Sequence, residues 1–162
     1  MPQTTIDTAP ARAYAGQIGE ALAPRYCRSA AAEGAGILPG QPVVRGTDPA
    51  KQAQAVANGD TINASTFAGF AVLETSRPEG GIADEAGVAV MAMGLMYVEV
   101  TAAVVAGNPV FVGNATAQLG DIDDAAGTGL VICPGCYFEE SGADGDLVLI
   151  SINLRTPIDT DT

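Results

Sequence analysis

The feature that most limits the fold of this chain is the regular interruption of short apolar runs by turn residues. From Ile37 onward, runs of a few apolar residues alternate with glycine, proline, asparagine or aspartate. A turn signal roughly every ten residues is typical of β-sandwiches and barrels. The sequence therefore predicts a mainly β fold, a compact β-barrel or sandwich body of short antiparallel strands. The expected strands lie near residues 41–45, 67–74, 87–93, 95–101, 109–113, 129–133, 136–139 and 146–154.

Two segments of this body need further comment. The stretch KQAQAVA, which starts at Lys51, fits either a short helix or a polar edge strand. In the strand near 87–93, side chains alternate between two faces, and both faces are apolar. Such a strand is buried on both sides, and we favour a place in the core over a contact with another subunit.

The body contains two similar short segments. PGQPVVRG, residues 39–46, resembles AGNPVFVG, residues 106–113, and each copy reads as one turn that leads into one strand. The match predicts two related β units, at about 37–86 and 87–162, with chance similarity as the alternative.

The first 36 residues differ from the body. Prolines at positions 2, 10 and 24 interrupt any helix, and the large apolar residues are too sparse for a core element. We therefore predict an extended N-terminal arm at 1–36 and a β-rich domain at 37–162. The large side chains of the arm need a surface on which to lie; they are Ile6, Tyr14, Ile18 and Leu22.

Charge argues against a nucleic-acid partner. Seven basic residues against nineteen acidic ones give a net charge of −12, which repels phosphate backbones. Residues 1–51 carry five basic and four acidic residues, whereas 52–162 carry two and fifteen. The imbalance fits a solvated acidic surface or, alternatively, an N-terminal segment that docks on another molecule. No apolar run approaches the ~20 residues of a membrane span, and the start lacks the pattern of a secretory signal, so we expect neither membrane insertion nor export by that route.

Cys133 and Cys136 flank a Pro-Gly pair, the spacing of a dithiol site or of half a zinc site. Pro134-Gly135 fits the centre of a type II hairpin turn, and we favour that turn over a disulfide or a catalytic dithiol. With three cysteines and no histidine, the chain lacks a usual zinc set and the commonest general base. We therefore expect no enzyme activity, no metal and no cofactor.

Aspartates cluster at GDIDDAAG, residues 120–127, and at ADGDL, residues 143–147. The first cluster departs from the EF-hand pattern, because alanines stand where a ligand and the glycine belong. Solvation of surface turns is the better account, with weak divalent-cation binding as the alternative.

Five motifs in order resemble the structural cement, or capsid decoration, proteins of tailed bacteriophages: YAGQIGE, ILPGQPVVRGTDP, TFAGFAVLE, GVAVMAMGLMYVEVTAAVVAGNPVFVG and GDLVLISINL. The resemblance spans nearly the whole chain, although the loop SRPEGGIADEAG departs from the pattern. It implies a virion protein on the outer capsid surface, made in the host cytoplasm, that ties neighbouring major capsid subunits together. It also implies a homo-oligomer, a trimer first and a dimer second. The capsid-contact residues it implies are Arg12, Tyr14, Ile18, Leu22 and Arg25.

Two other functions are compatible with the composition. A structural or adhesive β module of a phage tail or cell surface would share the same composition. An enzyme would have to rely on the two paired thiols or on carboxylates.

Overall fold

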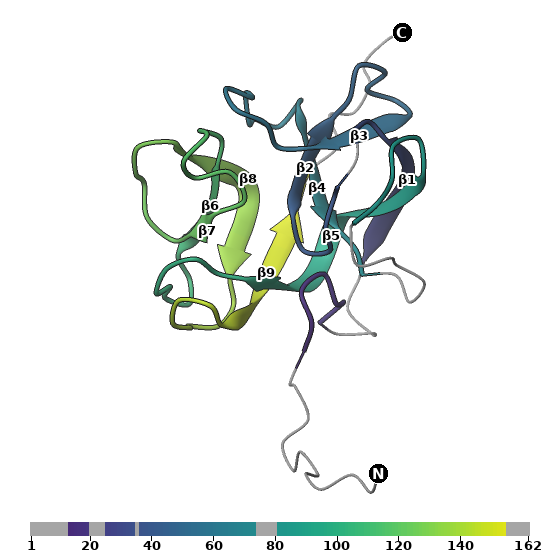
Figure 1. Cartoon of the computed structure of the whole chain (residues 1–162). Helices are drawn as coiled ribbons and strands as arrows, with labels where there is room; N and C mark the ends of the chain where they lie inside the picture. The colour runs from purple at the N-terminus through teal and green to yellow at the C-terminus, as the bar shows by residue number, and fades with distance from the viewer. Residues whose placement is uncertain (1–12, 20–24, 35, 74–80, 155–162) are drawn as a thin grey trace, which may run out of the picture.

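The structure is a computed structural model that describes residues 13–19, 25–34, 36–73 and 81–154 (Figure 1). The described residues form strands without any helix, which confirms the predicted β-barrel fold. The nine strands join in one sheet, in the order β1-β3-β2-β4-β5-β9-β8-β6-β7. They are β1 (Tyr26–Ala32), β2 (Pro42–Arg45), β3 (Gln52–Ala55), β4 (Phe67–Ala71), β5 (Gly87–Glu99), β6 (Pro109–Gly113), β7 (Ile122–Asp123), β8 (Leu130–Phe138) and β9 (Leu147–Asn153).

The first five strands close a barrel, because β1 pairs with both β3 and β5. The β1–β3 pair is parallel, and every other strand pair in the sheet is antiparallel. The ambiguous segment at Lys51 therefore contains a strand, β3. Strands β6 to β9 form the second lobe, and β5 lies between the two lobes (Figure 1).

The strands predicted near 87–93 and 95–101 are one continuous strand, β5, of 13 residues. Gly94 lies within it at φ 138°, a conformation that side-chain-bearing residues rarely adopt, so the glycine does not end the strand. Strand β5 contributes to two separate hydrophobic clusters: Val88 and Val90 belong to one, and Met91 and Met96 to the other. The predicted burial holds on the face of Val88, Val90 and Ala92, whereas on the other face Met91 is buried, Ala89 is half-buried and Met93 is 37% exposed.

The hairpin turn predicted at Pro134-Gly135 is wrong. Both residues lie inside β8, which pairs with β6 and β9. The register against β6 shifts between Pro109, opposite Tyr137, and Phe111, opposite Ile132, so the Cys-Pro-Gly-Cys segment is an insertion that bulges from the ladder. Gly135 has φ 70°, and a Cβ there would lie 2.4 Å from the carbonyl oxygen of Asn153. The glycine therefore allows β9 to lie close to β8, and it does not reverse the direction of the chain.

Part of the segment predicted as an arm belongs to the barrel. Strand β1 lies within residues 1–36 and pairs with β5 from Tyr26 to Ala31, with Ala30 and Ala32 buried. Its alternating small residues carry too weak an apolar pattern to be recognised as a strand from sequence. What remains of the arm prediction concerns residues before Ala13, which lie outside the described residues.

The two lobes repeat the same hydrogen bonds. In the first half, the N–H of Gly40 donates to Ala71 at 2.8 Å, and in the second half the N–H of Gly107 donates to Phe138 at 2.7 Å. Gly40 and Gly107 hold the same place in the PGQPVVRG and AGNPVFVG segments. Three further backbone bonds of the first half have a counterpart in the second. Written from N–H donor to C=O acceptor, the matching bonds are Ala71 to Gln41 and Phe138 to Asn108, Ala86 to Ala83 and Asp146 to Ala143, and Ala32 to Ala86 and Val100 to Asp146. The matching halves run over Tyr26–Met93 and Gly94–Asn153, so they meet inside β5; the sequence relationship predicted for 37–86 and 87–162 stays a prediction.

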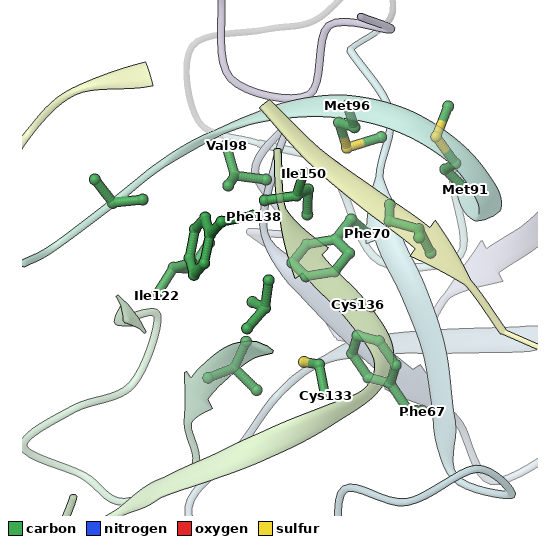
Figure 2. Close-up of a cluster of buried hydrophobic side chains, with 14 of the residues drawn as sticks. Phe67, Phe70, Met91, Met96, Val98, Ile122, Cys133, Cys136, Phe138 and Ile150 are labelled. Atoms are coloured by element: carbon green, nitrogen blue, oxygen red, sulfur yellow. The ribbon is translucent and has the colours of Figure 1, made fainter. Parts of the chain in front are cut away.

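Corresponding core positions carry different side chains. The first barrel encloses small residues such as Ala30, Ala53 and Ala71, whereas the matching positions of the second half hold Val98, Ile122 and Phe138. These larger side chains form one cluster with Phe67, Phe70 and Met91 from the first half (Figure 2). The two halves are thus joined by a shared core as well as by β5.

Candidate interaction surface

The predicted capsid-contact residues lie in different environments. Tyr14 is 63% exposed, and Arg25 is exposed at the start of β1. Ile18 is half-buried, forms an antiparallel bridge with Met96 and packs against the molecule's own core. Arg12 and Leu22 lie outside the described residues. Their role in binding a capsid stays a prediction, and Ile18 is already used in part within the chain.

Residues 13–19 are held on the body as a short added strand. The N–H groups of Gly16 and Gly19 each donate at 2.8 Å, to the carbonyl oxygens of Tyr97 and Leu95 respectively, and the N–H of Tyr97 donates to Gln17. The segment thus pairs with β5 at the point where β4 has ended. Leu73, two residues after the end of β4, also donates its N–H to the carbonyl oxygen of Gly16. Backbone pairing of this kind fixes the segment whatever its side chains are.

Gly16 lets this segment lie against the turn before β2. It has φ 77°, and a Cβ there would lie 2.7 Å from the backbone nitrogen of Gly40 and 2.8 Å from Cβ of Pro39. The glycines of the YAGQIGE and ILPGQ motifs therefore meet each other. Their contact explains, in physical terms, why both motifs contain glycine at these points.

A shallow hollow of about 200 Å³ opens beside this contact. Ala15, Leu38 and Pro39 line one side of it, and Glu99 and Thr101 from the end of β5 line another. Leu38 is 42% exposed at its rim, and Tyr14 neighbours Ala15 in the chain. An adjoining hollow of about 90 Å³ includes Leu119, which is 43% exposed. Exposed apolar side chains around a concave surface are typical of protein contact sites. We call the surface formed by Tyr14, Ala15, Leu38, Pro39 and Leu119 the apolar rim.

Sequence reasoning identified Tyr14 within the apolar rim but missed Leu38 and Leu119. Leu38 directly follows an apolar residue that proves to be buried, Ile37, and its own amide donates to the side chain of Gln41 in the turn that follows. Nothing in the local pattern separates the exposed leucine from its buried neighbour. The pairing of residues 16–19 with β5 is a long-range contact that only the fold reveals.

The paired cysteines lie in the hydrophobic core. Cys133 and Cys136 are both free and buried, 1% exposed, in the cluster that contains Phe67 and Phe138 (Figure 2). Burial, followed by a hydrogen bond with Cys136, raises the pKa of Cys133 well above its usual value. A protonated thiol in an apolar core is a poor nucleophile, so the arrangement offers a packing role and no dithiol site.

Two of the clustered aspartates, Asp124 and Asp146, accept hydrogen bonds within the chain. Oδ2 of Asp124 accepts from the N–H of Val105 at 2.8 Å and from the side-chain amide of Asn108 at 2.7 Å. Oδ2 of Asp146 accepts from the N–H of Ala143 at 2.8 Å. Within the described ranges, no group of three or more acidic or cysteine side chains is placed to hold a metal ion. Nor does that part of the chain include a helix of the length and apolarity that crossing a membrane requires.

Comparison with known proteins places the fold. Residues 2–153 match the family described as "Structural cement protein (E217 gp24/Pam3 gp6)". The chain belongs to this family. A solved chain from "The capsid of Myoviridae Phage XM1" superposes on the cement protein with a TM-score of 0.76, at 18% sequence identity, covering 93% of this chain and 96% of that one. At that identity the likeness concerns the fold. No curated protein matches the sequence.

The family gives the cement protein a structural role in the virion, as a component that decorates and reinforces the capsid. It associates with capsid subunits. The resemblance of its five motifs to this family is thereby confirmed.

Proposed function

We propose that this cement protein binds the outer surface of a tailed-phage head and ties neighbouring major capsid subunits together through the apolar rim. The family match over residues 2–153 is the observation that carries the proposal. The rim supports it, because Leu38 and Leu119 expose apolar area at two adjoining hollows that partner side chains could fill, and the exposed Tyr14 precedes the lining residue Ala15. A clamp of this kind needs no catalytic group, and the buried thiols and turn-bound aspartates are consistent with a protein that is not an enzyme.

The contact residues predicted from the resemblance fit this surface in part. Tyr14 belongs to the apolar rim, and Arg12 precedes it in the chain by two residues. We propose that Arg12 and Tyr14 contact the capsid at the point where the N-terminal segment joins the body. Leu22 and Arg25 belong to the same proposal with less structural support, since Arg25 lies at the start of β1.

We further propose that the protein acts as a homo-oligomer, a trimer first and a dimer second. Several weak contacts on one symmetric particle bind together at high effective concentration, so each rim contact can be modest. A trimer suits the three-fold positions of an icosahedral head.

The test is binding to expanded heads that lack the endogenous cement protein. Leu38→Asp should weaken binding, because a charge in the rim must be desolvated, and the loss should be about tenfold or more. The matched control is Val105→Asp: Val105 holds the corresponding place in the second half and is 57% exposed, yet lies outside the rim. Equal losses for both variants, or none for Leu38→Asp, would contradict the rim as the contact surface.

A deletion tests the N-terminal segment separately. Because β1 belongs to the barrel, a chain without residues 1–36 would lose a core strand, so the deletion should stop after Arg12. We expect the shortened chain to fold and to bind heads more weakly. Binding equal to that of the full chain would remove this segment from the mechanism.

A further inference from the structure

The matching halves differ sharply at one set of corresponding positions. Met96 on β5, Val112 on β6 and Ile152 on β9 close one end of the second half, and all three are almost fully buried. The corresponding positions of the first half hold Arg28 on β1, Arg45 on β2 and Ala92 on β5. The strand register shows the match: Arg28 lies opposite Val90, just as Met96 lies opposite Ile150 in the second half. Two arginines and an alanine thus stand where the other half has three apolar side chains.

These residues surround a hollow of about 50 Å³. Tyr26, Phe67 and Leu154 supply apolar walls, and the two arginines supply the charge. We call this site the arginine hollow. The filled end of the second half shows that this fold can close the position with apolar side chains, so the hollow is a local property of the first half.

The arginines have few acceptors. Nε of Arg45 is buried and finds no hydrogen-bond acceptor among the residues that the structure describes. The guanidinium of Arg28 donates to the carbonyl oxygen of Pro49 at 3.1 Å, and no carboxylate of the described chain forms an ion pair with either arginine. A buried donor without an acceptor costs roughly 1–3 kcal/mol, more when it carries charge, and such groups usually indicate a missing partner.

Charge indicates what that partner carries. All four Lys and Arg residues of the described chain lie in the first half, on β1 to β3 and their borders: Arg25, Arg28, Arg45 and Lys51. Residues 94–154 contain no Lys or Arg, and their eight acidic residues are Glu99, Asp121, Asp123, Asp124, Glu139, Glu140, Asp144 and Asp146. The first half also carries acidic residues, so its positive charge is local to the arginine hollow, where Arg28 and Arg45 lie together. Paired arginines favour a carboxylate because their N–H groups match its two oxygens, and the second half supplies carboxylates without any cation among them.

We propose that the arginine hollow binds a carboxylate side chain from the second half of a neighbouring copy of this chain. The contact runs head to tail: the arginine hollow of one copy meets the acidic second half of the next. It rests on the proposed homo-oligomer, and it names the surface by which the copies recognise each other. A head-to-tail contact that closes produces a ring, in which every hollow is occupied.

The experiment measures self-association of the purified full chain by sedimentation at about 0.15 M salt, where exposed long-range charges are screened beyond ~8 Å. Arg45→Val places in the hollow the residue that the second half uses, so the fold should tolerate it. We expect the dissociation constant between copies to rise roughly thirtyfold or more, the effect of removing one partner of a buried, hydrogen-bonded charge pair. Lys51→Met is the control: it removes the same charge from an exposed residue that lies 3.5 Å from Asp48 and does not line the hollow.

A second measurement keeps the outcome independent of folding. In ¹⁵N-labelled wild-type protein, the Nε–Hε signal of Arg45 should shift as concentration drives association, whereas that of Arg25, exposed at the start of β1, should shift less. Unchanged association of Arg45→Val, with its melting temperature preserved, would overturn the proposal.

Binding to expanded heads separates this proposal from the capsid role. Wild-type protein that stays monomeric at every concentration, while Arg45→Val loses head binding, would assign the carboxylate to a capsid subunit and overturn the contact between copies. Loss of self-association in Arg45→Val with weakened but measurable head binding is the expected result. Failure of the wild-type chain to bind heads at all would contradict the capsid function and leave the self-association result standing on its own.

Discussion

Gly69 is the position where a single methyl group should damage this fold most. It lies in β4 at φ 131°, and a Cβ there would lie 2.0 Å from the carbonyl oxygen of Met91 and 2.8 Å from its carbonyl carbon. Both atoms belong to the backbone of β5, so no side chain can rotate out of the way. Gly69→Ala must therefore separate β4 from the strand that both halves share.

The expected cost has two parts. An unfavourable backbone conformation costs roughly 1–2 kcal/mol, and forced displacement in a packed interior costs roughly 1–3 kcal/mol. The free energy of unfolding should thus fall by about 2–5 kcal/mol. For a domain of this size each kcal/mol lowers the melting temperature by about 2–4 °C. Scanning calorimetry should show a melting temperature lower by roughly 4–20 °C, and urea titration a proportionate shift of the midpoint.

Gly145→Ala is the matched control. Gly145 also has a positive φ, 82°, but a Cβ there would have no atom within 4 Å. Glu85 occupies the corresponding place in the first half with φ 62°, so this fold tolerates a side chain in that conformation. Gly145→Ala should cost no more than about 1 kcal/mol. If the two variants lose equal stability, the close approach of β4 and β5 is not what requires glycine at position 69.

Three further changes test other parts of the structure. In the folded protein at pH 8, a thiol reagent should modify Cys27 well before Cys133, whose raised pKa and burial keep it protonated and covered; equal rates, read by mass spectrometry, would contradict the buried assignment. Hydrogen bonds from Thr47 lower the pKa of Glu33, so their stabilising effect is present above the unfolded pKa of roughly 4.3 and is lost as pH falls through the lower folded value. Thr47→Val should therefore narrow the difference between the urea midpoints at pH 7 and pH 3, and an unchanged difference would count against this bond. Phe138→Ala should lower the free energy of unfolding by about 3–5 kcal/mol, because Phe138 is 1% exposed in the shared core; a loss below 1 kcal/mol in urea titration would show that the site collapses around the cavity.

The sequence predicted the β fold and most strands because turn residues separate apolar runs in the body. It failed where a strand lacks that pattern: β1 consists largely of small residues, and it is a strand because β5 and β3 pair with it. It also failed at Pro134-Gly135, where a sequence typical of a turn is accommodated as a bulge, since β9 comes close enough to need a glycine there. Local propensity could not distinguish these cases, because partner strands far along the chain decide them.

The candidate surfaces were less accessible to prediction. Tyr14 was recognised because it is a large side chain in a polar, proline-interrupted segment. Leu38 was not, because exposure depends on which side of a turn faces the hollow. The arginine hollow emerges only when Arg28 and Arg45 are compared with Met96 and Val112, and that comparison requires the strand register.

The continuity of β5 has a mechanical consequence. Its first half is a wall of the closed barrel, and its second half pairs with β9 along seven residues. Because β5 runs from one lobe to the other without a linker, a force applied to one lobe is transmitted to the other through the backbone of β5. The backbone hydrogen bonds between β5 and β9 then carry this force along the direction of the strands. Both lobes should consequently unfold together in a single cooperative transition, whether they are pulled or heated. Such behaviour suits a protein that holds capsid subunits together.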